Sequence, residues 1–201
     1  MKKVLLSAVA LLAFGFANAQ EEKSANGGFA KGDVFVSGSF GIASDKAYDA
    51  DLDFVESTGF SFMPKVGFFV TENIAVGGKL GFASMKAEVE GVDVEETSEL
   101  SLGAFGRYYM TPASQFSVFA ELGLDYNSTD YKLADLQKNG FGANLGLGLS
   151  YFVSSNFALE AGVAVLGFNS EKFDVDGAET ESSFGLGADL TNVSLGVVYK
   201  F

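Results

Sequence analysis

Apolar and polar side chains alternate along most of the chain with a period of two residues. The clearest example closes the sequence, where every second position is apolar: Val193, Leu195, Val197, Tyr199 and Phe201. Alternation with this period is typical of a β-strand with one apolar and one polar face. The same pattern predicts seven earlier strands, within residues 33–42, 59–70, 74–82, 100–110, 116–126, 141–151 and 157–165.

The connections between the predicted strands alternate in length. Three are short, at 71–73, 111–115 and 154–156, and four are long and mostly polar, at 43–59, 84–99, 128–139 and 169–189. Short turns on one side and long loops on the other are typical of an up-and-down barrel in a membrane. A tilted strand spans the bilayer with about nine to eleven residues, which fits these strands. The pattern therefore predicts an eight-stranded antiparallel up-and-down transmembrane β-barrel.

The two faces of the predicted strands decide which side points outward. The minor face is rich in Gly, Ser and Ala and carries the charged residues Lys65, Lys79, Arg107, Glu121 and Glu160. The major face consists of Phe, Leu, Val and Tyr, which are too large for the lumen of eight strands and are therefore predicted to face lipid. The alternative, a secreted lipocalin-like barrel with its apolar face inside, would have an exterior rich in Gly and poor in charge.

The five minor-face charges are predicted to pair with one another inside the barrel, because buried charges need partners. Interior side chains normally fill a barrel of eight strands, so we favour a filled core. A narrow ion pathway lined by the same residues is the functional alternative.

Aromatic residues cluster near the strand ends, as two membrane–water interfaces would favour. One group lies beside the short turns and the C-terminus: Tyr108, Tyr109, Phe116, Tyr151, Phe152, Phe157, Tyr199 and Phe201. A second group lies near the long loops: Phe40, Phe60, Phe62, Phe82, Tyr126, Phe141 and Phe168. Phe105 and Phe119 are exceptions, since they fall in mid-strand on the minor face.

The N-terminus has the features of a secretory signal peptide. Lys2 and Lys3 precede an apolar run over residues 4–16, and Ala17-Asn18-Ala19 offers a small-x-small cleavage site. The predicted organisation is a signal peptide over 1–19, a short periplasmic segment over 20–32 and a barrel domain over 33–201. A buried N-terminal helix is the alternative for the first segment.

Composition excludes several classes of function. The chain has a net charge of −13 and no Cys or His. Such an acidic chain is not expected to bind nucleic acid, disulfides and a lipid-modified cysteine are excluded, and Ser/His catalysis is impossible. We predict no catalytic, cofactor or metal site, although a hydrolase with two paired carboxylates stays open as a class. The acidic stretches 84–99 and 169–189 are expected to be solvated, with divalent-cation bridging to lipid head groups as the alternative.

Several segments carry a family resemblance: "VSLGVVYKF", "GFFVTENIAVGGKLGF", "GAFGRYYMT", "FSVFAELGLDY" and "YFVSSNFALEAG". In this order they resemble the small OmpA/OmpX-type family of bacterial outer-membrane β-barrels. The resemblance implies an outer-membrane location, with both termini and the short turns in the periplasm and the long loops outside. It also implies that the barrel-assembly machinery, aided by periplasmic chaperones, reads Val193, Leu195, Val197, Tyr199 and, above all, Phe201.

One residue departs from the strand pattern. Pro64 cannot donate a hydrogen bond to a ladder, so a bulge, or a strand that starts after Met63, is expected. The function expected for the whole chain is structural or surface-interactive and non-enzymatic, with outer-membrane lipids as surroundings and an unknown surface ligand. A small porin-like channel for ions or small solutes is the alternative.

Overall fold

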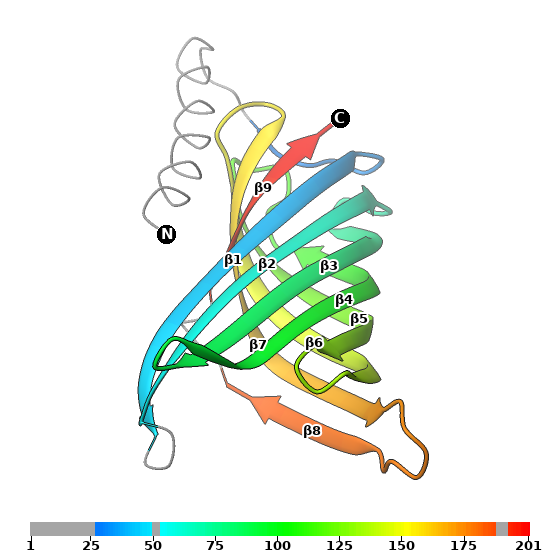
Figure 1. Cartoon of the computed structure of the whole chain (residues 1–201). Helices are drawn as coiled ribbons and strands as arrows, with labels where there is room; N and C mark the ends of the chain where they lie inside the picture. The colour runs from blue at the N-terminus through cyan, green and yellow to red at the C-terminus, as the bar shows by residue number, and fades with distance from the viewer. Residues whose placement is uncertain (1–26, 50–52, 188–192) are drawn as a thin grey trace.

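The computed structural model describes residues 27–49, 53–187 and 193–201 and consists of β-strands (Figure 1). The predicted signal peptide, residues 1–19, lies outside the described residues. The strands are β1 (Val34–Asp49), β2 (Asp53–Phe69), β3 (Ile74–Val89), β4 (Val92–Tyr109), β5 (Phe116–Tyr131), β6 (Leu136–Phe152), β7 (Phe157–Phe173), β8 (Glu181–Leu186) and β9 (Ser194–Lys200). No helix among the described residues is long and apolar enough to cross a bilayer.

The strands close into a barrel because β9 pairs on both of its edges. Each strand from β1 to β7 pairs antiparallel with the next, β9 pairs with β7 and with β1, and β8 extends the same row along β7. Phe35 of β1 lies opposite Lys200, and Phe157 of β7 lies opposite Tyr199. Thus β8 and β9 are two pieces of one broken strand, and the predicted eight-stranded antiparallel barrel is confirmed (Figure 1).

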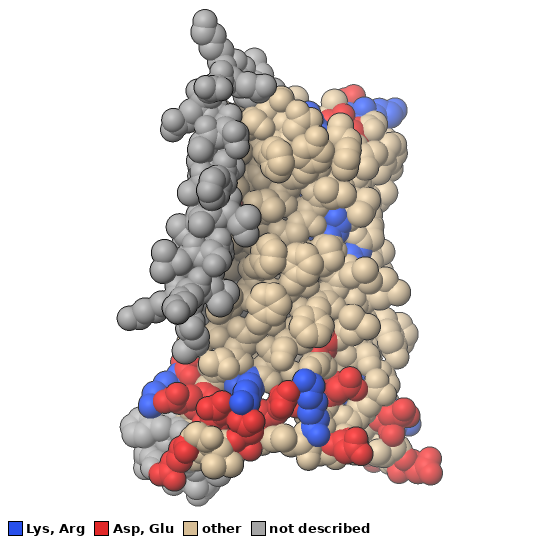
Figure 2. Space-filling model, turned by 45° about the horizontal axis from the view of Figure 1, so that its top comes forward, with Lys and Arg blue, Asp and Glu red and all other residues tan. Residues whose placement is uncertain are grey.

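The apolar face of the sheet points outward and the mixed face points into the lumen. Large outward side chains such as Leu102, Leu122 and Leu124 are exposed, whereas Phe35 and Phe69 are buried inside. On the face shown in Figure 2 an almost uncharged band covers the wall, and charged side chains gather below it. Water would not tolerate so continuous an apolar exterior, so this band is the surface that contacts lipid.

The prediction of long polar loops is wrong, because most residues of the predicted loops belong to paired strands. The strands β1 to β7 are 16 to 18 residues long, which exceeds the roughly ten residues that span a bilayer. Lys86 lies opposite Glu96, and only Glu90 and Gly91 form the turn, both with positive φ. Outside the bilayer a strand needs no apolar face, so the alternation disappears although the ladder continues.

Pro64 neither forms a bulge nor delays the start of β2, as the sequence had suggested. β2 begins at Asp53 and pairs Pro64 with Gly38 of β1. On its other edge the register resumes unshifted, with Phe62 opposite Phe82 and Lys65 opposite Lys79. The barrel therefore accommodates the missing N–H group of Pro64 through a short gap in the β2–β3 ladder.

We predict that arginine at Leu122 destabilises the barrel by about 2–4 kcal/mol, the cost of a cation on the lipid face near the bilayer midplane. Leu133, in the turn between β5 and β6, provides a matched control because both leucines are 55% exposed. Urea unfolding in lipid vesicles should show a large effect for Leu122→Arg and almost none for Leu133→Arg. Equal small effects would mean that the outward face does not contact lipid.

Candidate functional site

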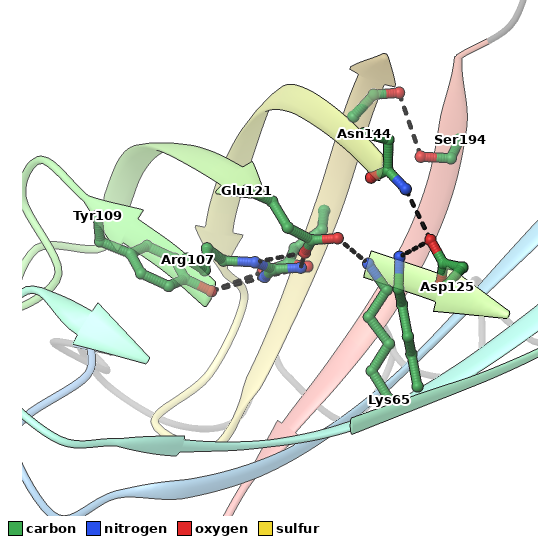
Figure 3. Close-up of polar contacts among 10 residues, drawn as sticks. Lys65, Arg107, Tyr109, Glu121, Asp125, Asn144 and Ser194 are labelled. Atoms are coloured by element: carbon green, nitrogen blue, oxygen red, sulfur yellow. Dashed lines mark hydrogen bonds and ion pairs between the residues drawn. The ribbon is translucent and has the colours of Figure 1, made fainter. Parts of the chain in front are cut away.

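A network of charged side chains crosses the lumen, centred on the buried Arg107 of β4 (Figure 3). The Nε and Nη2 atoms of Arg107 donate to Glu121 Oε2 of β5, at 2.9 and 2.6 Å. Its Nη1 atom donates to both carboxylate oxygens of Glu160 of β7, at 2.8 and 2.9 Å, and to the Tyr109 hydroxyl at 2.7 Å. One guanidinium therefore ties three strands together across the barrel.

Two lysines extend the network toward the charged rim, which is the end of the barrel that carries the ion pairs of Lys86, Lys132 and Lys138. Lys65 donates to Glu121 Oε1 at 2.5 Å, and Lys79 donates to Asp125 Oδ2 at 2.9 Å. Asn144 donates to the same Asp125 oxygen at 2.7 Å (Figure 3). Every cation of this group has an acid as its partner, which offsets much of the cost of removing it from water.

Strand register explains why these residues meet. Arg107 lies directly opposite Glu121 in the β4–β5 ladder, so the pair forms across neighbouring strands. Lys65 and Lys79 also lie opposite one another, in the β2–β3 ladder, where two like charges would repel. The two lysines avoid this conflict because they bind different carboxylates on β5. Lys65 binds Glu121 and Lys79 binds Asp125, which lies further along the same face of the strand.

An aromatic layer closes the lumen below the charged network, at the end with the short turns. Its side chains are all buried: Phe29, Phe35, Phe69, Phe105, Tyr109, Phe119 and Phe152. Arg107 joins the two layers, since its guanidinium carbon lies 4.0 Å from the ring centre of Phe119. Tyr109 and Phe152, which the sequence placed in an interfacial belt, are thus corrected to lumen residues because their strand positions point inward.

The centre of the aromatic layer comes from outside the strands. Phe29 belongs to the segment Gly27–Asp33 that precedes β1, and only 2% of its surface is exposed. Its ring stacks on that of Phe69 with 4.6 Å between the centres and contacts the edge of Phe152 at 4.9 Å. The segment that the sequence predicts as periplasmic, residues 20–32, therefore contributes one side chain, that of Phe29, to the inside of the barrel.

The rest of the lumen is open toward the charged rim. A cavity of about 500 Å³ lies above the network, with hydroxyl and amide side chains on its walls. These include Ser37, Ser39, Ser61, Ser101, Asn127 and Asn169. Arg107, Glu121 and Glu160 form part of its lining, so the cavity ends on the charged layer.

Ion pairs also hold the rim together. Lys86 contacts Asp93 and Glu88, and hydrogen bonds to these carboxylates raise its pKa. Lys138 contacts Glu181 and Glu171, and the hydrogen bond to Glu181 is the main cause of its raised pKa. The second set links β6 to both β7 and β8, at the end of the β7–β8 hairpin where Glu171 lies opposite Glu181.

The structure brings together all five charged residues that the sequence placed on the minor face. The strand pattern places Asp125, Asn144 and Tyr109 on the same alternating face, but the sequence prediction did not include them in the paired interior group that the structure shows. It also missed Phe29, for which the strand pattern offers no signal. Of the C-terminal residues singled out by the sequence, Leu195, Val197 and Phe201 are exposed on the outward face and Tyr199 is half-buried, whereas Val193 precedes β9 and borders the cavity. The Phe201 amide donates to Val34 O at 3.0 Å.

A family comparison agrees with this architecture. Residues 7–201 match the family described as outer membrane protein beta-barrel domain. The chain belongs to this family. It is therefore an integral β-barrel protein of the bacterial outer membrane, as the sequence predicted. No curated protein gives a significant match.

Solved structures show the same fold. Neisserial surface protein A (NspA) aligns with a TM-score of 0.51 at 19% identity, over 86% of this chain and 99% of its own. The outer membrane protein OprG from Pseudomonas aeruginosa aligns with a TM-score of 0.50 at 16% identity, over 89% of this chain and 99% of its own. The barrel is thus of the size and topology of known small outer-membrane barrels.

We predict that Arg107→Met lowers the free energy of unfolding by about 3–5 kcal/mol, because Glu121 and Glu160 lose a buried partner. Adding Glu160→Gln should restore part of the loss, since it removes one uncompensated charge. As a control, Lys132→Met breaks the exposed pair with Glu96 and should cost less than about 1 kcal/mol. Urea unfolding in micelles measures all three, and equal effects of the two single variants would contradict the buried network.

Proposed function

We propose that the protein is a non-conducting outer-membrane barrel with a structural role in the membrane and an interactive role at its charged rim. The observation that carries this proposal is that two layers of side chains, one charged and one aromatic, fill the cross-section of the lumen. The Arg107 network lies directly above the aromatic layer, which consists of buried side chains, and the buried Arg107 contacts Phe119 of that layer. A path for ions would have to displace both. The proposed role involves no catalysis and no cofactor.

The orientation is part of the proposal. We infer that the closed end, with the short turns and the described part of the N-terminal segment, faces the periplasm and that the rim faces outward. The extended strands support this view, because the long hairpins carry most of the ion pairs and exposed acids beyond the apolar band (Figure 2). Membrane lipids then surround the wall, and the assembly machinery and chaperones meet the chain during insertion.

The rim is suited to interaction because many of its acids are not engaged within the chain. Among the described residues, Glu95, Asp174, Asp176 and Glu179 are exposed and form no ion pair. They lie on paired hairpins or on the turn between β7 and β8, so their positions are defined by the barrel. A basic partner surface is the kind that would complement them.

A small channel is the second candidate, and the cavity of about 500 Å³ favours it. The cavity would admit small polar solutes from the rim. Its floor, however, is the ion-paired layer of Arg107, Glu121 and Glu160, below which lies the aromatic layer. The arrangement therefore supports a cavity that is closed at one end better than a continuous pore.

Planar-bilayer recordings test the closed lumen. The unmodified protein should insert without steady, salt-dependent open channels, because two side-chain layers block the path. Arg107→Met should remain closed as well, since the aromatic layer stays in place in that variant. Steady conductance from the unmodified protein would contradict the non-conducting role and favour the channel.

Orientation is testable because the chain has no Cys. We predict that a membrane-impermeant maleimide labels Ala134→Cys on intact cells but not Ser155→Cys. Both positions are exposed; Ala134 lies in the rim turn between β5 and β6, and Ser155 in the short turn between β6 and β7. Both variants should label in lysed cells, and labelling of Ser155→Cys alone on intact cells would reverse the orientation.

A further inference from the structure

The segment Gly27–Asp33 is held in the closed end of the barrel by strands from all around its circumference. The Phe29 ring contacts Phe35 of β1, Phe69 of β2, Tyr109 of β4 and Phe152 of β6, with ring centres 4.6 to 5.5 Å apart. No single hairpin contains this pocket. It exists only when strands that are far apart in the sequence have been brought into one ring.

Backbone hydrogen bonds fix the path of the segment. The Phe29 amide donates to Pro112 O at 2.7 Å, and the Gly32 amide donates to Phe69 O at 2.9 Å. The Ala30 amide donates to Asp33 Oδ2 at 2.9 Å, which closes a tight turn in which Gly32 has a φ of 95°. The segment therefore enters the mouth in one defined conformation before β1 begins.

The two glycines before Phe29 are sterically required. A Cβ atom on Gly28 would lie 2.6 Å from the carbonyl carbon of Ala113, and one on Gly27 would overlap the Phe152 side chain. The first obstacle is backbone of the β4–β5 turn, which cannot rotate away as a flexible side chain would. Any larger residue at Gly28 must shift the segment out of the mouth.

The last strand supplies the contact that completes the pocket. Lys200 Nζ of β9 donates to Gly28 O at 2.6 Å, lies 3.6 Å from Asp33 Oδ2, and lies 5.6 Å from the ring centre of Phe152. The Lys200 backbone is itself fixed by its amide hydrogen bond to Asn156 O and its place opposite Phe35. Lys200 is thus positioned only after β9 has paired with both neighbours.

We propose that Gly27–Asp33 is a latch, a segment that docks into the short-turn end of the barrel, its mouth, only after β9 has closed the ring. Lys200 of β9 holds the docked latch through its contacts with Gly28 and Asp33. The latch completes the aromatic layer and ties the start of the described chain to its terminal strand. Released, it leaves a closed barrel with an open mouth. Because its pocket requires β1, β2, β4, β6 and β9 together, seating follows closure and cannot precede it.

Chymotrypsin distinguishes the states, because cleavage after Phe29 requires the segment to leave its pocket. Protein purified from membranes is unfolded in urea, returned to micelles, and digested briefly at intervals. Unfolded chains are degraded, closed but unlatched barrels lose the residues up to Phe29, and latched barrels stay intact in a mass spectrum. Unheated gel migration reports closure in the same samples.

For the unmodified protein, protection of Phe29 should appear together with the compact gel form or after it. Lys200→Met and Gly28→Ala should keep the compact form but be clipped after Phe29 about tenfold faster or more, since clipping follows the population of the open state. Lys31→Met, which changes an exposed lysine of the same segment, and Gly185→Ala, where a Cβ meets open space, should match the unmodified protein.

Two outcomes would overturn the latch. Protection of Phe29 before the compact form appears would mean that the segment nucleates the barrel rather than following closure. Full protection in both Lys200→Met and Gly28→Ala would mean that the segment is held neither by the contacts of Lys200 nor by the close packing of Gly28 against the Ala113 backbone. The time course of the unmodified protein tests the order of events even if a variant fails to fold.

Discussion

The constraint on which the structure depends is that hydrocarbon offers no partner to a backbone N–H or C=O group. Each such group in the wall must find its hydrogen bond within the sheet, so the sheet has to close on itself. The closing strand here is β9, whose edges pair with β7 and β1. Residues 194–200 thus complete the ring, and the Phe201 amide that follows them donates to Val34 O.

Closure determines the chemistry of both faces. An outward side chain contacts lipid and is apolar, whereas an inward side chain enters a space too narrow for many rings, so small residues alternate with a few large or charged ones. A charge that enters this space must be paired there, and Arg107 meets this requirement with two carboxylates and a hydroxyl. The ion network is thus a consequence of building a narrow barrel in a membrane, and it fills the lumen between the aromatic layer and the cavity.

Period-two alternation was sufficient to predict the barrel, its strand number and the face on which Arg107 and its partners lie, because all three follow from side-chain direction within a strand. It failed where the physical signal ends. Beyond the bilayer the ladder continues without an apolar face, so strands were predicted as loops. In β7 the extra residue Val165 shifts the register opposite the step from Leu145 to Gly146 and reverses the alternation. Phe29 lies outside any strand, and only the closed ring creates its pocket.

The lumen changes character along its axis, so its packed part and its open part lie at opposite ends of the barrel. Aromatic rings fill the end with short turns, paired charges follow, and hydroxyl and amide groups line the open cavity toward the rim. The aromatic layer and the Arg107 network draw their side chains from the wall and from the segment around Phe29, and none of them comes from the charged hairpin ends. The buried layers and the charged rim are therefore built from different parts of the same strands, so a substitution at a hairpin end beyond the bilayer removes no side chain from the aromatic layer or the Arg107 network.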